Sequence, residues 1–206
     1  RTNATVAVAA NRSVFKFRSI KARRHVNESA KPLSTQLAVN DFELFGLPVQ
    51  FAQDRAQLDA RWKDLQREAH PDKFASQGTA AQRVAMQWSV RINEAHQRLK
   101  DPLKRAAYLC ELQGIAVQAE SNTAMPAAFL MQQMAWREAL EDTDQVNTLE
   151  ALADEVAAER KRVQQLLAQL LDVEHDAQAA VAQVRALMFI ERFAHEVDAK
   201  LDKLSA

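Results

Sequence analysis

Apolar side chains recur at steps of three and four residues over most of the chain beyond residue 40, which is the spacing of one face of an α-helix. Two such stripes flank the segment His70-Pro71-Asp72. They predict helices over about 54–69 and 79–100, joined as a helical hairpin, because Pro71 disfavours helical geometry at His70. The stripes are formed by Leu58, Trp62, Leu65 and Ala69, and by Val84, Trp88, Ile92, Ala95 and Leu99.

Shorter helices are predicted on both sides of this hairpin. The first begins near Asn40, a favourable N-cap, and carries Phe42 and Phe45, which should plug the open end of the hairpin. The second covers about 103–112 and is followed by a glycine, as helix ends commonly are. Residues 39–114 are therefore predicted to form one helical unit.

The periodicity breaks over residues 115–126, which predicts a linker. Helices are then expected at about 126–142, 145–171 and 176–204. Short connections between long helices favour antiparallel neighbours, so residues 127–206 are predicted to form a three-helix bundle. The middle and last helices supply apolar stripes for its core: Val146, Leu149, Val156, Val163, Leu166, Leu167 and Leu170, then Leu187, Ile190, Ala194, Val197, Leu201 and Leu204.

The first helix of the bundle carries two apolar faces, although one is enough for a three-helix core. One face consists of Phe129, Trp136 and Leu140. The other consists of Leu130, Met131 and Met134, with Glu138 beside them, and Met188 and Phe189 of the last helix likewise point away from its stripe. Either a thick core or the N-terminal unit covers these residues, or they form an exposed, methionine-rich surface that binds a partner.

Composition agrees with an all-α fold, because the 206 residues include only three glycines and five prolines and show no alternating strand pattern. No apolar run is long enough to predict a membrane span. The single cysteine, Cys110, excludes an internal disulfide and a thiolate cluster, and its apolar neighbours favour a buried, inert thiol.

The formal net charge of zero hides an uneven distribution. Residues 1–40 carry eight basic residues and one acidic residue, whereas residues 114–206 carry eight basic and sixteen acidic residues. A folded part this acidic argues against nucleic-acid binding. The aperiodic, arginine-rich segment 1–38 has the composition of a mitochondrial transit peptide. A disordered or non-native extension is the alternative, and the segment is excluded from the predicted fold.

The sequence around the hairpin resembles a J-domain. Residues 41–47 (Asp-Phe-Glu-Leu-Phe-Gly-Leu), His70-Pro71-Asp72-Lys73-Phe74, Ile92-Asn93-Glu94-Ala95, Leu99, Asp101-Pro102, Arg105-Ala106 and Tyr108 occur in its order and spacing. The resemblance covers residues 40–113 and implies docking on ATP-bound chaperones of the DnaK class, with stimulation of ATP hydrolysis. It assigns chaperone contact to His70, Pro71 and Asp72, and electrostatic steering to Arg61, Lys63 and Arg67 on the second helix.

Without the resemblance, the tripeptide is equally compatible with a simple turn, and the basic face with a solvated surface. His96 departs from the J-domain pattern, which often has a larger aromatic residue there, and we expect it to alter local packing only.

A second resemblance covers the bundle. Residues 129–138 (Phe-Leu-Met-Gln-Gln-Met-Ala-Trp-Arg-Glu) and 185–193 (Arg-Ala-Leu-Met-Phe-Ile-Glu-Arg-Phe) are similar to the C-terminal domain of HscB-type co-chaperones. The resemblance implies that the bundle binds the iron–sulfur scaffold IscU and delivers it to the specialised chaperone HscA. The residues that match the scaffold-binding positions of that family are Leu130, Met131, Met134, Glu138 and Phe189. Ala135 departs from the pattern, because it offers no acidic side chain.

We expect a monomeric, non-enzymatic protein without cofactor or metal. Eukaryotic members often begin with a cysteine-based zinc module, which this chain lacks, so a bacterial cytoplasmic protein is expected. The mitochondrial matrix is the alternative if residues 1–38 are a transit peptide.

Three other functions stay open from the residues: a J-domain co-chaperone for a different client, a helical adaptor without ATPase stimulation, and an enzyme or metal site. The last would have to use His70, Asp72, His175 or His195. No two histidines have the spacing of helical metal ligands, and no glycine-rich phosphate loop is present. We therefore expect neither an enzyme nor a metal site.

Overall fold

The computed structural model describes residues 39–117 and 125–205, and every regular element within these ranges is a helix, which confirms the predicted all-α fold. The N-terminal arm (residues 39–117) comprises α2 (Asp41–Phe45), α3 (Arg55–Glu68), the short 3₁₀ helix η1 (Pro71–Gln77), α4 (Thr79–Lys100) and α5 (Pro102–Leu112). The C-terminal arm (residues 125–205) comprises α6 (Ala127–Asp142), α7 (Val146–Ala168), the π-helical turn η2 (Gln169–Val173) and α8 (Ala177–Ser205).

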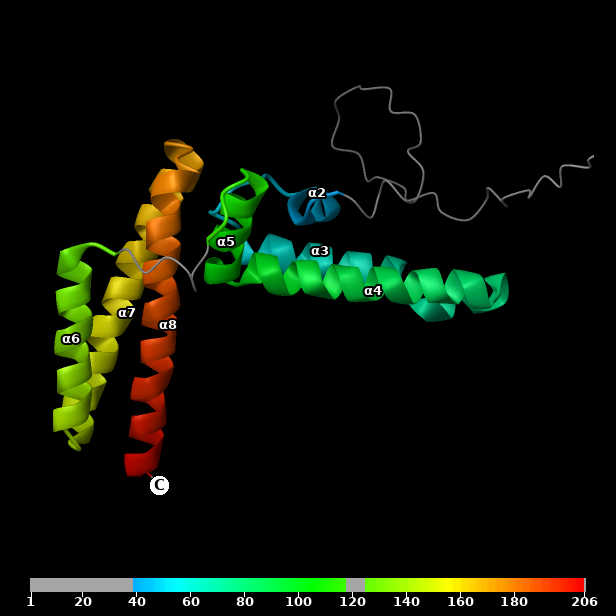
Figure 1. Ribbon diagram of the computed structural model, residues 1–206. Coiled ribbons are helices and arrows are strands. Elements are labelled where there is room, and N and C mark those ends of the chain that lie inside the picture. The colour runs from blue at the N-terminus through cyan, green and yellow to red at the C-terminus, as the bar shows by residue number, and fades with distance from the viewer. Residues whose placement is uncertain (1–38, 118–124, 206) are drawn as a thin grey trace, which may run out of the picture.

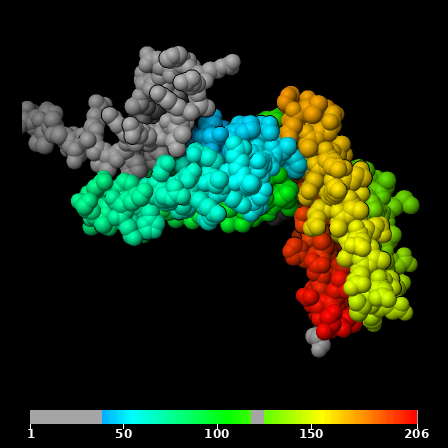
Figure 2. All heavy atoms as spheres, turned by 180° about the vertical axis from the view of Figure 1, so that it is seen from behind, coloured from blue at the N-terminus to red at the C-terminus, as the bar shows by residue number. Residues whose placement is uncertain are grey.

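The two arms meet at an angle and give the molecule the outline of an L (Figures 1 and 2). The predicted N-terminal extension and most of the predicted linker lie outside the described residues. None of the described helices is long and apolar enough to cross a membrane.

Helices α3 and α4 form the predicted hairpin. Asp54 caps α3, because its Oδ1 accepts hydrogen bonds from the backbone N–H groups of the first turn, at 2.8 Å from Ala56 and 3.2 Å from Gln57. The predicted stripes face each other and are buried at Leu58, Leu65, Trp88, Ile92 and Leu99. Local capping and apolar spacing therefore place both helices within a residue of their predicted bounds.

Helix α2 closes the open end of the hairpin, as predicted from Phe42 and Phe45, which are both fully buried. A buried ion-pair cluster that sequence analysis did not identify holds it there. The Asp41 carboxylate lies 2.5 Å from Arg91 and 2.7 Å from Arg98, and the Asp41 N–H donates to the Tyr108 hydroxyl at 3.0 Å. Because a buried carboxylate is costly unless paired, these contacts are needed for α2 to dock in this position.

In the C-terminal arm, α6 and α8 both pack along α7 (Figure 1). Trp136 of α6 stacks on Phe193 of α8 with ring centroids 5.6 Å apart, and its indole Nε1 donates to Glu155 of α7 at 2.8 Å. One side chain thus joins all three helices of the bundle.

Two details of the predicted bundle core and one of its connections are wrong. Val146 and Leu204, assigned to the core, are exposed in the first turn of α7 and the last turns of α8, where the bundle tapers to a free end. Phe193, left out of the stripe, is fully buried. The predicted turn at residues 172–176 is shorter, because a π-helical turn extends α7 through Val173 and His175 takes a left-handed conformation (φ 55°) to reverse the chain.

The arms share one continuous apolar core, in which α5 packs against α8. The polar part of the junction lies between the α2–α3 loop and η2, where the Asp172 carboxylate accepts the backbone N–H groups of Phe51 and Ala52. Arg185 of α8 donates to the Val117 carbonyl at 2.9 Å. The junction is thus formed by both apolar packing and directional hydrogen bonds.

Candidate functional site

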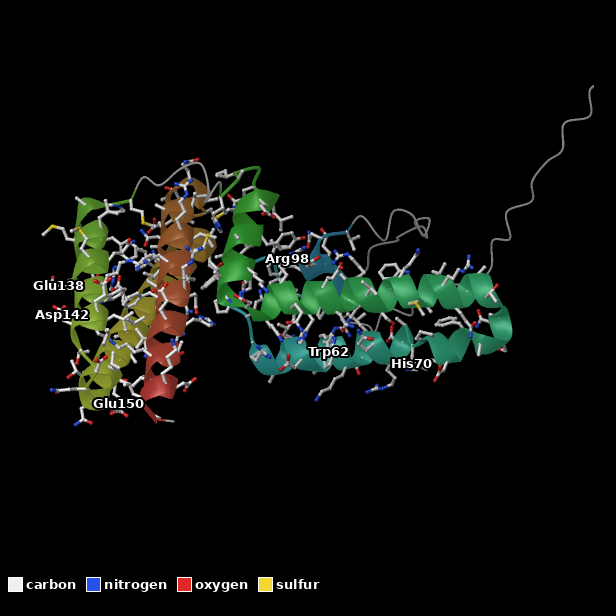
Figure 3. The ribbon with its side chains drawn as sticks, turned by 60° about the horizontal axis from the view of Figure 1, so that its bottom comes forward. Trp62, His70, Arg98, Glu138, Asp142 and Glu150 are labelled. Atoms are coloured by element: carbon white, nitrogen blue, oxygen red, sulfur yellow. The ribbon has the colours of Figure 1, made fainter. Side chains whose placement is uncertain are left out.

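The segment His70-Pro71-Asp72, called the His70 loop below, lies toward the end of the hairpin that is remote from the bundle (Figure 3). His70 has an extended backbone (φ −63°, ψ 126°), as the following proline requires, and η1 begins at Pro71. The His70 Nδ1 accepts the Asp72 N–H at 3.3 Å, so the histidine side chain caps η1. The carboxylate of Asp72 is left 90% exposed, and the His70 ring 57% exposed.

Two contacts fix the backbone of this loop. The side chain of Phe74, a residue of η1, is buried, and the Ser89 hydroxyl of α4 donates to the Ala69 carbonyl at 3.2 Å. The loop therefore presents an exposed carboxylate and an imidazole on an anchored backbone. Such an arrangement supports recognition by shape and charge.

The basic residues predicted to steer a partner differ in their surroundings. Arg61 is half-buried, and its Nε donates to the Phe45 carbonyl at 2.9 Å, so it also holds α2 against α3. Arg67 is exposed and pairs with Asp64 at 3.1 Å, while Lys63 is exposed. The positive surface of α3 is therefore carried most directly by Lys63 and Arg67.

His96 is buried in the hairpin, where its ring stacks on Trp62 at 4.7 Å and its Nε2 lies 2.7 Å from Asp59 Oδ1. It therefore occupies an aromatic packing position, as expected of a residue that alters local packing. The hydrogen bonds from Arg55 and from His96 lower the pKa of Asp59.

The second apolar face of α6 is exposed. Met131 and Met134 are each 72% exposed, and Leu130 and Glu138 are also exposed. We call these four residues the α6 patch; Glu138 is labelled on α6 in Figure 3. The core face is confirmed, with Phe129 and Trp136 buried and Leu140 half-buried. Neither a thick core nor the N-terminal arm covers the α6 patch.

Phe189 is placed differently from the α6 patch. Its ring is half-buried, meets Phe129 edge-on at 5.9 Å and stacks on Phe193 at 5.9 Å, with the Arg137 guanidinium 5.6 Å above it. The expectation that Phe189 points away from the core is thus only partly right. Its position supports α6 against α8 and leaves part of the ring accessible.

Sequence analysis missed two further features, one on α4 and one at the junction of the arms. Met86 and Val90 on α4 are exposed and line a groove of about 450 Å³ with Arg83, Gln87, Arg91 and Glu94. Their spacing of four residues, off the main stripe of α4, was the available signal. The Asp172 contacts had no local signal, because their partners lie 120 and 121 residues away.

No group of three or more His, Cys, Asp or Glu side chains within residues 39–117 and 125–205 is arranged to hold a metal ion. Cys110 is buried as predicted, and burial raises the pKa of its thiol to about 11. Its Sγ faces the Ala177 carbonyl across the junction at 3.8 Å.

The fold is that of a J-domain protein with a second, C-terminal helical domain. A Burkholderia thailandensis protein described as a co-chaperone protein HscB homolog is 53% identical over 166 residues, which are 79% of this chain and 94% of that relative. The chain therefore belongs to the HscB co-chaperone family.

Other comparisons agree with this family. A Cupriavidus taiwanensis homolog of the same description is 49% identical over 84% of this chain and 99% of its own length. The family model of the HSCB C-terminal oligomerisation domain matches residues 125–198. Among solved structures, chaperone HscB from Vibrio cholerae is 39% identical with a TM-score of 0.71, covering 81% of this chain and 99% of that one. Human co-chaperone protein HscB shares the fold at 22% identity, with a TM-score of 0.75 and coverage of 84% and 85%.

Proposed function

We propose that this co-chaperone stimulates the ATPase of a specialised DnaK-class chaperone, HscA, and delivers the iron–sulfur scaffold IscU to it for cluster assembly or transfer. The observation that carries the proposal is the presence of two exposed, chemically different surfaces on opposite arms of one molecule. In this division, residues 39–114 act as the J-domain, residues 115–126 as a linker and residues 127–206 as the scaffold-binding bundle.

On the chaperone side, His70, Pro71 and Asp72 form the contact, and the contact involves no covalent chemistry. A ligand shifts a two-state equilibrium only by binding one state better than the other. The fixed carboxylate of Asp72 provides such a difference, if the ATP-bound chaperone places a basic group opposite it. Arg61, Lys63 and Arg67 orient the encounter, because exposed charges contribute to association rate and register more than to affinity.

On the scaffold side, Leu130, Met131 and Met134 supply apolar area that is unoccupied in the isolated protein. Methionine side chains are flexible and polarizable, which suits a surface that must fit a partner. Glu138 adds a charge at the rim that favours a basic group on the scaffold. Phe189 lies beneath the contact, where it keeps α6 in place and contributes the exposed part of its ring. At Ala135 the scaffold gains no acidic contact.

Joining the two surfaces in one chain raises the effective concentration of the scaffold at the chaperone. We place this activity in the bacterial cytoplasm, in keeping with the bacterial relatives. The mitochondrial alternative depends on residues 1–38, which lie outside the described residues.

The test is ATP hydrolysis by the cognate chaperone, titrated with wild-type protein and with His70→Gln, with and without scaffold. We expect stimulation by the wild type and its loss in His70→Gln. Ser76→Ala, at an exposed position of η1, is the matched control and should stimulate like the wild type. Absence of stimulation by the wild type would mean that the protein is a helical adaptor without ATPase stimulation.

The client is tested separately by replacing Leu130 and Met131 with serine. Scaffold affinity should collapse, while stimulation measured without scaffold should survive. An unchanged affinity for IscU would mean that the bundle carries a different client.

A further inference from the structure

Asp172 forms two of the hydrogen bonds between the arms at the junction, in addition to the one from Arg185 to the Val117 carbonyl. Its Oδ1 accepts the Phe51 N–H at 2.5 Å and its Oδ2 accepts the Ala52 N–H at 2.8 Å, so one carboxylate binds two successive amides of the α2–α3 loop. Hydrogen bonds to an ionised acceptor are short and about twice as strong as neutral ones. The contact thus pairs a charged side chain of the C-terminal arm with the backbone of the N-terminal arm.

The loop is also held by Arg105 of α5. The buried Arg105 guanidinium lies over the Phe51 ring at 4.9 Å and donates to the Leu99 carbonyl. Burial lowers the pKa of Arg105, and the nearby charges of Asp101 and Asp172 oppose that change. Phe51 is therefore clamped by two contacts, its ring with a cation of its own arm and its backbone N–H with a carboxylate of the other arm.

Apolar packing of α5 on α8 alone would not set a single angle between the arms. Across different helix pairs, crossing angles scatter by about 15–20° around the preferred classes, so a helix–helix contact does not by itself specify the angle. Two hydrogen bonds from adjacent amides to one carboxylate are directional, and they join the α2–α3 loop to η2 beside the α5–α8 contact. They therefore select one orientation from those that the apolar contact permits.

The clamped loop leads directly into α3. Ala52 is two residues from Asp54, the N-cap of α3, and α3 ends two residues before His70. The orientation of the loop is thus passed along one rigid helix to the chaperone-binding surface.

We propose that Asp172 is a positioning residue, which fixes the His70 loop relative to the α6 patch so that chaperone and scaffold meet in one geometry. The inference deepens the proposed function and rests on it. Asp172 is outside both binding surfaces, so its loss should leave each separate interaction intact and weaken their coupling.

Orientation is measured first, without any partner. Spin labels are attached at Ser76→Cys on η1 and Glu150→Cys on α7, both exposed positions on different arms. Cys110 stays unlabelled, because a buried thiol with a pKa of about 11 reacts poorly. We expect a narrow distance distribution in the parent and one about twice as broad in Asp172→Ala, because two directional, charge-assisted hydrogen bonds between the arms are lost.

The matched control is Asp176→Ala. Asp176 lies four residues away and caps α8 by accepting the Ala179 N–H at 2.9 Å, so its loss removes a local hydrogen bond within the C-terminal arm. This variant should keep the parent distance distribution. An unchanged distribution in Asp172→Ala, or equal broadening in Asp176→Ala, would overturn the clamp.

Coupling is measured second, as the extra ATPase stimulation that scaffold adds. In Asp172→Ala this increment in stimulation should fall about tenfold. This is the fold-change that corresponds to the free energy of one charge-assisted hydrogen bond. Stimulation without scaffold and the scaffold affinity should stay at wild-type values, and Asp172→Glu should restore part of the increment. A full increment in Asp172→Ala despite a broadened distribution overturns the positioning role. Absence of stimulation by the wild type overturns the proposed function instead.

Discussion

The His70 loop and the α6 patch, the two surfaces proposed to bind partners, differ in their chemistry. The loop presents a charge and an imidazole on a backbone that Phe74 and Ser89 anchor. The α6 patch presents flexible apolar side chains on a regular helix, with Met131 and Met134 each 72% exposed. The contribution of a fixed charge to binding depends on its position, whereas the contribution of an apolar surface depends on its area. We therefore expect single substitutions to be decisive in the loop and graded in the α6 patch.

Asp72→Asn should produce the largest effect, because it removes the charge and keeps the shape. We expect ATPase stimulation to fall at least tenfold, roughly what the loss of a charge-paired interface contact causes. Scaffold affinity and melting temperature should be unchanged, because the carboxylate is 90% exposed. Titration of the chaperone with the variant measures the effect. Wild-type stimulation by Asp72→Asn would mean that the chaperone recognises the shape of the loop backbone and not the charge of Asp72.

Met131→Ala should reduce scaffold affinity by roughly five- to thirtyfold, the range for one well-placed interface residue, and Met134→Ala should add to it. Calorimetric titration with the scaffold measures the change. Met86→Ala is the matched control, since Met86 is 60% exposed on α4. Equal loss in the control would show that exposed methionines act without regard to position.

Salt should separate the two surfaces further. Lys63→Gln is expected to slow association with the chaperone about threefold at low ionic strength and to have little effect at high salt, since exposed charges are screened. Scaffold binding through the α6 patch should change less with salt. Stopped-flow association rates at two salt concentrations test this, and a salt-independent effect of Lys63→Gln would argue against steering.

The smallest expected effect concerns acid stability of the hairpin. The pKa of Asp59 is lowered from 3.8 by hydrogen bonds from Arg55 and His96, so the folded state favours the ionised carboxylate. This stabilisation is present above the unfolded pKa and is lost as pH falls through the folded value. Urea unfolding at about pH 6 and about pH 3 should show a smaller loss of stability for Asp59→Asn than for the wild type. An equal loss would assign the acid sensitivity to other carboxylates.

Local features of the chain were sufficient for most of the helices. The caps at Asn40 and Asp54 and the stripes of α3 and α4 act within a few residues, so they are visible in the sequence. The second apolar face of α6 was also visible in the sequence, but the residues alone left open whether a thick core or the N-terminal arm covers it or whether it is exposed.

Features that depend on tertiary contacts were not predictable in this way. The Asp172 contacts span more than 100 residues, and the partial burial of Phe189 depends on where Phe129 and Phe193 place their rings. The role proposed for His70 rests on resemblance, since an exposed imidazole at a helix end has no unique chemistry of its own.

The burial of Cys110 has a consequence for the cargo that the protein is proposed to escort. With a thiol pKa of about 11, only about one molecule in ten thousand carries a thiolate at neutral pH. Iron–sulfur clusters are held mainly by cysteine thiolates. Because Cys110 is the single cysteine of the chain, the protein offers almost no thiolate that could compete with a scaffold for a bound cluster.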